Sequence, residues 1–111
     1  MVSDGANLGT AIWQSVCYIT LPPGKWLVFG QANIINRGSA SNITLYQKII
    51  VETGANTYKD VMSDALGAIQ RNIQTVGFVD LDVARAVYLQ VYSNLAGSQI
   101  YSKAITAVRI G

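Results

Sequence analysis

Histidine is absent from the 111-residue sequence, and cysteine occurs once, as Cys17. The lack of histidine removes the commonest metal ligand and general base, and a single cysteine cannot form an internal disulfide. Zinc sites and cysteine–histidine catalysis are therefore excluded. Cys17 lies in a strand-like run, where we expect a small buried hydrophobic side chain rather than a reactive thiol.

Charged residues are also scarce. They make up 13% of the chain, against about 25% in an average globular domain, while hydrophobic residues make up 50%. A small monomer of this composition has too few polar side chains to cover its surface, which indicates oligomerisation. The eight basic and six acidic residues are scattered singly, which predicts no nucleic-acid partner. No apolar run approaches the ~18 residues of a membrane-spanning helix, and no signal-peptide pattern opens the chain, so we expect cytoplasmic synthesis without membrane insertion.

The acidic residues offer little for catalysis. Asp80 and Asp82 fall on one side of an expected strand, about 7 Å apart by the strand rise, and could bind Ca²⁺ or form an acid–base pair. Six acidic residues supply too few ligands for a full Ca²⁺ shell, so solvated carboxylates at a strand end are the simpler interpretation. No serine or lysine has a plausible base, and no glycine-rich phosphate loop is present. The sequence therefore predicts no enzyme activity, no cofactor and no metal.

The dipeptide Pro23-Gly24 predicts the turn on which the rest of the chain is organised. Proline and glycine suit the two central positions of a type II turn, which should join a strand at 11–21 to a paired strand at 25–35. The second strand begins apolar on both faces, with Trp26 on one side and with Leu27 and Phe29 on the other. A strand of this kind needs cover on both faces. One cover can be the core of a sandwich, and the other a neighbouring subunit.

Strand-like alternation recurs along the chain and predicts at least six strands, at 11–21, 25–35, 42–52, 71–81, 83–94 and 100–110. Without alternating helices, this pattern indicates an all-β sandwich or jelly roll. We predict a lead-in or linker at 1–9 and one domain at 10–111. Apolar residues at 53–67 recur at helical spacing, which is compatible with a short helix and equally with a loop that contains a helical turn.

Two parts of the chain resemble a known family. They are Ile19-Thr20-Leu21-Pro22-Pro23-Gly24-Lys25-Trp26-Leu27-Val28, and the ending from Val87-Tyr88-Leu89-Gln90-Val91 through Tyr101 to Arg109-Ile110-Gly111. Together they resemble the C1q/TNF-like jelly-roll heads found at the C-termini of bacteriophage tail fibres and baseplate receptor-binding proteins. In that family a hairpin with leucine, a proline or small residue, glycine and an aromatic residue opens the domain. A strand with an arginine-isoleucine-glycine-like tail closes it.

The resemblance implies a homotrimer around a three-fold axis that carries a receptor-binding tip on upstream fibre or baseplate segments of a virion. Its expected function is non-catalytic binding to a host cell-surface receptor, with a saccharide as the expected class. The alternative is a purely structural trimeric knob or decoration protein. Tyrosines suit a subunit interface, because the ring supplies buried area and the hydroxyl can be satisfied at a wet seam. The residues that we expect at this interface are Trp26, Tyr88, Tyr92, Tyr101 and Arg109.

Receptor contacts are expected in predicted loops that combine an aromatic side chain with amide and charged neighbours. Residues 56–60 have this composition, and the candidate receptor-binding residues are Asn56, Tyr58, Lys59 and Asp60, with Arg37 as a second choice. An ordinary polar loop is the alternative interpretation.

Overall fold

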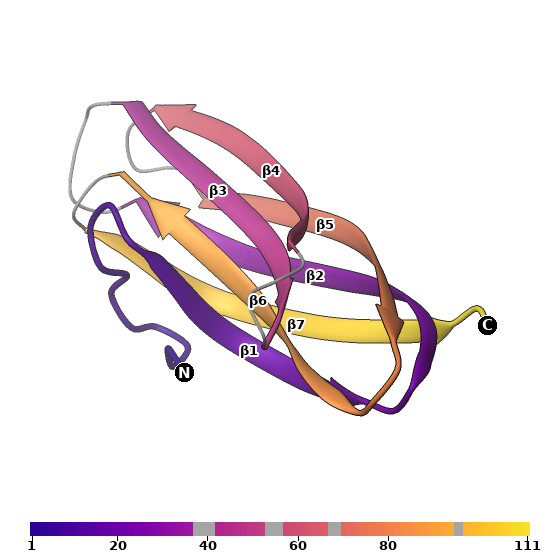
Figure 1. Ribbon diagram of the computed structural model, residues 1–111. Coiled ribbons are helices and arrows are strands. Elements are labelled where there is room, and N and C mark those ends of the chain that lie inside the picture. Colours follow the sequence, from indigo (N-terminus) through magenta and orange to yellow (C-terminus); the bar gives the residue numbers. More distant parts are fainter. Residues whose placement is uncertain (37–41, 53–56, 67–69, 95–96) are drawn as a thin grey trace.

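The computed structural model describes residues 1–36, 42–52, 57–66, 70–94 and 97–111. For residues 36, 42–43, 57–66 and 70 the description covers the backbone alone. Seven strands form, β1 (Trp13–Leu21), β2 (Gly24–Asn36), β3 (Asn42–Val51), β4 (Thr57–Leu66), β5 (Gln70–Leu81), β6 (Arg85–Ser93) and β7 (Ser98–Arg109). They make two antiparallel sheets, of order β1-β6-β3-β4 and β5-β2-β7. Figure 1 shows the sheets as two stacked layers along an elongated molecule of 45 × 21 × 20 Å. The predicted all-β class is confirmed, and the two layers are compatible with a β-sandwich.

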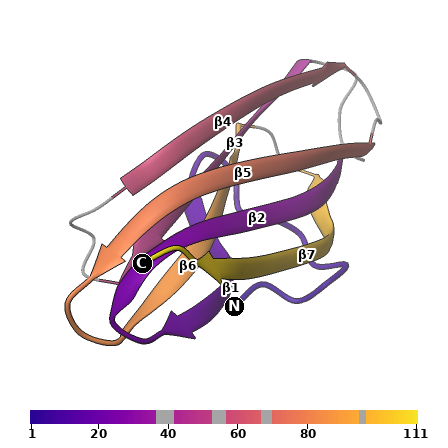
Figure 2. The same ribbon diagram turned by 90° about the vertical axis from the view of Figure 1, so that its right-hand side faces the viewer.

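The chain bends at Pro23, but it does not make the predicted hairpin. Gly24 is already the first residue of β2, and its positive φ of 144° lies far from the value of about 80° that a type II turn has at this position. The strands on either side enter different sheets, because β1 pairs with β6 whereas β2 pairs with β5 and β7 (Figure 2). Each of the two strands finds its hydrogen-bonding partners within its own sheet. The predicted pairing of these two strands is therefore wrong, and the bend connects the two layers.

The core lies between the layers and is built from alternate residues of both sheets. In β6 the alternation is regular, with Val87, Leu89 and Val91 buried. Gly30, in the middle of β2, leaves room for Leu89, since a Cβ on this glycine would lie 2.5 Å from Leu89 Cδ1. The other fully buried apolar residues on the two inner faces include Val16, Val28, Ile34, Leu45, Ile49, Val79 and Ile100.

A bulge in β1 changes which side chains face outward. The register against β6 shifts between Ser15 and Cys17. Strict alternation would place Tyr18 on the buried side with Val16, but after the bulge Tyr18 is exposed and lies opposite Tyr88. One extra residue in a strand therefore moves an aromatic ring from the core side to the solvent side.

The segment at 57–66 is neither the predicted helix nor the alternative loop. It is β4, which runs antiparallel to β3 from the pair Asn42↔Leu66 to the pair Ile50↔Thr57. On its other side β3 pairs with β6, so β4 supplies the partner for the backbone groups along the second edge of β3. Pairing with a neighbouring strand outweighs the helical spacing of the apolar residues. The backbone of 57–60 is consequently part of a strand and not of the predicted loop.

Part of the predicted lead-in, residues 1–9, packs against the sandwich. Leu8 belongs to the core cluster, and Asn7 forms an isolated antiparallel β-bridge with Gln99 of β7. The Gly5 N–H donates to the carbonyl of Ile100 over 2.6 Å. These contacts attach the start of the chain to the last strand.

Candidate functional site

The outer face of the three-stranded sheet carries an apolar patch. It consists of Leu27, Phe29, Val76, Phe78 and Val108, which we call the Phe29 patch. In the strand register Leu27 lies opposite Phe78 on β5 and opposite Val108 on β7, and Phe29 lies opposite Val76. Phe29 is 39% exposed and Phe78 42% exposed. The second apolar face predicted for β2 therefore exists, and within the described residues it faces solvent.

The other half of the same face is polar, and its side chains bond to one another. The Asn72 amide donates to Asn33 Oδ1 over 2.8 Å, and the Asn33 amide donates to Ser102 Oγ over 2.7 Å. This hydrogen-bonded chain runs across β5, β2 and β7. The three-stranded sheet thus presents one half with satisfied polar groups and one half of hydrocarbon.

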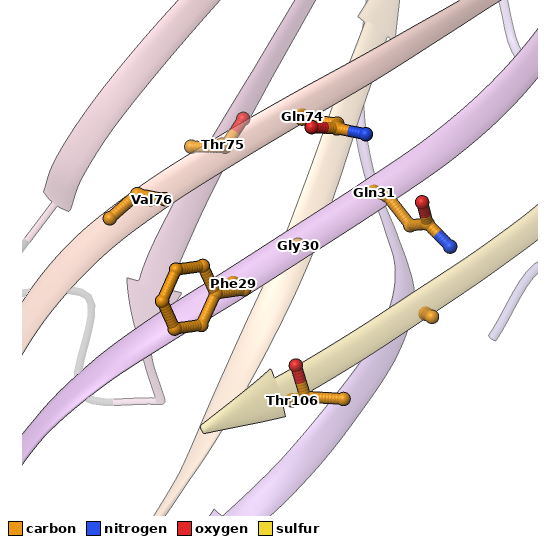
Figure 3. A pocket seen from close by; sticks show the side chains of 8 residues that line it. Phe29, Gly30, Gln31, Gln74, Thr75, Val76 and Thr106 are labelled. Carbon is orange, nitrogen blue, oxygen red and sulfur yellow. The ribbon is translucent and has the colours of Figure 1, made fainter. Parts of the chain in front are cut away.

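A shallow pocket of about 280 Å³ lies where the two halves meet. Figure 3 shows Phe29 and Val76 at one end and Gln31 and Gln74 at the other, with Thr106 beside them on β7. Gly30, Thr75 and Ala104 complete the lining. The pocket can receive a side chain or ring that is apolar at one end and hydrogen-bonding at the other.

The outer face of the four-stranded sheet is aromatic. Trp13, Tyr92 and Tyr46 form a row across β1, β6 and β3. The Tyr92 ring centroid lies 5.6 Å from that of Trp13 and 5.6 Å from that of Tyr46. A second cluster lies farther along the same strands, where the ring centroids of Tyr18 and Tyr88 are 5.7 Å apart. We call these five residues the aromatic face.

A polar row separates the two aromatic clusters. Gln90 lies opposite Ser15 on β1 and opposite Lys48 on β3, and the Gln90 amide donates to Ser15 Oγ over 3.0 Å. The Lys48 ammonium stands 4.1 Å from the centroid of the Trp13 ring, within the range of a cation–π interaction. Amide, hydroxyl and ammonium groups therefore lie between aromatic rings.

The structure places the five predicted interface residues at three locations. Tyr88 and Tyr92 belong to the aromatic face. Trp26 and Arg109 lie together at one end of the other sheet, where Arg109 Cζ is 5.5 Å from the Trp26 ring centroid. Tyr101 is exposed on β7. Their role at a subunit interface stays a prediction.

The predicted receptor-binding residues fall largely outside what the structure describes. Asn56 and Arg37 lie outside the described residues. The backbone of Tyr58, Lys59 and Asp60 lies in β4, where Asp60 is the strand partner of Lys48. Their role in receptor binding stays a prediction.

Sequence analysis missed Trp13, Tyr18 and Tyr46 as parts of one surface. Tyr46 alternates with buried residues and is an evident outward residue, but the registers of β3 and β1 against β6 are needed to join it to Trp13. The same holds for Val76 and Phe78, which only the β2–β5 register brings to Phe29. Alternation identifies the face of a residue only where the strand has no bulge, and pairing is needed to identify its neighbours.

Titratable groups do not gather into a reactive centre in the described ranges. There, histidine, cysteine, aspartate and glutamate form no group of three that could hold a metal ion. Asp80 and Asp82 are both exposed. Partial burial raises the pKa of the Cys17 thiol above its ordinary value, with Lys103 acting in the opposite direction, so the thiol is held in its unreactive form. None of the described segments is a helix long and apolar enough to cross a membrane.

No family model matches the chain, and none of the curated proteins matches it. Among solved structures, a chain in the structure of infectious bursal disease virus, strain Gx, resembles it with a TM-score of 0.55 and 6% sequence identity. The match covers 96% of this chain and 31% of the viral chain. At this identity the likeness shows the fold alone.

Proposed function

We propose that this chain is the non-catalytic head domain of a phage tail fibre or baseplate protein, that it assembles as a homotrimer, and that it binds a host-surface saccharide. The resemblance of its opening turn and final strand to C1q/TNF-like heads supports this assignment. Consecutive strands that mostly alternate between two antiparallel sheets suit a jelly roll. The fold likeness to a chain in a virus structure is in keeping with a virion component.

The Phe29 patch is the observation that carries the proposal. At 39% and 42% exposure, Phe29 and Phe78 each present roughly 80 Å² of apolar surface to water. Together with Leu27, Val76 and Val108, the patch reaches the ~300–600 Å² at which an exposed apolar surface is commonly functional. Continued exposure of this area would be unfavourable, so a partner surface is expected to cover it.

A second copy of the chain is the partner that this face suits. Its apolar half has the composition of an interface core, and its hydrogen-bonded half has that of a polar rim. Closed rings of copies are the usual way to bury such a face without open-ended assembly. The trimer follows from the family resemblance, and the pocket beside Phe29 offers a recess for a side chain of the neighbouring copy.

The native mass in solution tests the assembly. Three chains of 11.9 kDa give about 36 kDa by light scattering on a sizing column. Val76→Lys should shift this mass toward the monomer, because a charge within the patch cannot be buried without a partner. Val83→Lys is the matched control, since Val83 lies beyond the end of β5 and is 45% exposed, against 46% for Val76. A monomeric wild-type protein, or equal masses for both variants, would contradict the assignment of this face.

Binding to host cells or to purified surface glycans tests the receptor function. The alternative, a structural trimeric knob, uses the same Phe29 patch and differs only in lacking a ligand. A trimer that binds neither cells nor glycans would therefore support the knob and remove the receptor-binding part of the proposal.

A further inference from the structure

We infer that the aromatic face of the four-stranded sheet is the saccharide-binding surface of this domain. The inference rests on the proposed receptor function and names the residues that would carry it. It places the ligand on Trp13, Tyr18, Tyr46, Tyr88 and Tyr92, on the sheet opposite the Phe29 patch.

The spacing of the two aromatic clusters suits an extended ligand. Tyr88 and Tyr92 are four residues apart on β6, which is about 13 Å by the strand rise. Gln90 lies midway between them, with Ser15 and Lys48 on either side in the strand register. A short oligosaccharide that stacks on both clusters would pass over these polar groups.

The residue types on this face match the two surfaces of a sugar ring. A pyranose ring has a face of C–H groups that packs on an aromatic ring and a rim of hydroxyls that needs donors and acceptors. Tyrosine and tryptophan offer both a ring and a polar group, and the Gln90 amide can donate and accept. The Phe29 patch has rings without polar groups, which favours a protein surface. The two outer faces thus differ in the ligand chemistry that they suit.

Side chains of the aromatic face already contact one another in the absence of a ligand. The rings of Trp13, Tyr92 and Tyr46 support one another at centroid distances of 5.6–6.3 Å. Lys48 rests on the Trp13 ring, and Gln90 is held by Ser15. Side chains that are already positioned lose little conformational entropy when a ligand arrives.

Charge argues against a nucleic acid as the occupant. Three rows of paired residues face outward on β1, β6 and β3: Trp13–Tyr92–Tyr46, Ser15–Gln90–Lys48 and Tyr18–Tyr88–Ile50. Among these described residues, Lys48 is the one with a basic side chain. Binding a phosphate backbone requires several basic groups along its path. An uncharged or weakly acidic saccharide needs no such array.

Binding to a glycan array that carries glucose-, galactose- and N-acetylglucosamine-based oligosaccharides tests the inference. Trp13→Ala and Tyr18→Ala should each weaken binding to the best oligosaccharide by about tenfold, since each removes one stacking ring. Both side chains are partly exposed, so the fold should persist. Val83→Ala is the control, because Val83 is 45% exposed beyond the end of β5 and belongs neither to the aromatic face nor to the Phe29 patch. The control should bind as the wild type does.

Intrinsic fluorescence gives a second measure of ligand binding at the aromatic face. It keeps the residues of that face intact, so a loss of signal cannot result from an alanine variant that fails to fold. The chain has two tryptophans, and Trp26→Phe leaves Trp13 as the only one, which can be excited selectively at a wavelength that tyrosine does not absorb. Addition of the array's best oligosaccharide should then shift or quench the emission of Trp13. An unchanged emission at saturating ligand would overturn the inference.

The outcomes separate this inference from the function on which it rests. If the wild type binds a glycan and Trp13→Ala and Tyr18→Ala bind it equally well, receptor binding survives and the aromatic face is not its site. If the wild type binds no glycan but captures a host-surface protein, two assignments fail. The receptor is then not a saccharide, and the aromatic face is not a saccharide site. Native mass is independent of either result and continues to report on the trimer.

Discussion

Gln47 is a buried amide that joins the two sheets. It extends from β3, and its Nε2 donates to Thr75 Oγ1 over 2.7 Å and to the carbonyl of Ile73 over 3.3 Å. A longer contact, 3.4 Å, runs to the carbonyl of Gly30. Its Oε1 is buried and has no partner among the described residues. The amide therefore contributes specificity to the packing of the layers while leaving one acceptor unsatisfied.

We expect Gln47→Met to destabilise the protein by about 1–3 kcal/mol, because the hydroxyl of Thr75 loses its partner inside the core. The double variant Gln47→Met with Thr75→Val removes both partners and should recover most of that loss. Urea unfolding of the wild type, both single variants and the double variant measures the coupling. Additive single-variant costs would show that the two side chains do not act together.

The central strand β2 depends on a residue without a side chain. Gly30 faces Leu89, which is fully buried, and a Cβ at this position would require the end of the leucine side chain to shift within the core. The Phe29 side chain on the opposite face of the strand is unaffected by this contact. Packing of the layers and exposure of the Phe29 patch can consequently be altered separately.

Gly30→Ala should lower the free energy of unfolding by about 1–3 kcal/mol through overpacking. In a Leu89→Ala background the same substitution should cost much less, because the space it needs is then available. Thermal or urea unfolding of the four proteins measures both effects. An equal cost in the two backgrounds would show that the strain lies elsewhere than at Leu89.

Six of the seven strands follow from alternation and turn residues, and the reasons for the errors are local. The prediction of a helix or loop at 53–67 is wrong for the described part, 57–66, because the spacing within one segment carries no information about the open edge of β3. The exposed side of Tyr18 departs from strict alternation because of a bulge that no residue type predicts. The pairing across Pro23-Gly24 fails because both its strands find partners elsewhere. In the candidate sites, alternation predicts outward residues such as Tyr46, but it cannot predict the outward side of Tyr18 or the neighbours of any residue across strands.

The two outer faces of the molecule have different proposed roles, assembly for the Phe29 patch and saccharide binding for the aromatic face. The effect of assembly on saccharide binding can therefore be tested. A trimer presents three aromatic faces to a surface coated with ligand, so its apparent affinity exceeds that of one face. We expect Val76→Lys to bind an immobilised glycan at least about tenfold more weakly than the wild type. Its affinity for the free oligosaccharide in solution should be unchanged.

Surface plasmon resonance on immobilised glycan, compared with titration calorimetry of the free oligosaccharide, measures the two quantities. Val83→Lys should match the wild type in both. Loss of affinity for the free oligosaccharide in Val76→Lys would show that the saccharide site includes the Phe29 patch or spans two copies.

The attachment of the start of the chain to its last strand affects how the domain forms. Asn7 meets Gln99, β1 pairs with β6, and β2 pairs with β7, so most of the ladders join segments that are distant in the sequence. Folding that depends on distant pairing is slow, in the millisecond-to-second range for small all-β domains. On the ribosome, β2 has one edge without a partner until β7 has been synthesised. Until then the unpaired edge of β2 is open to pairing with strands of other chains.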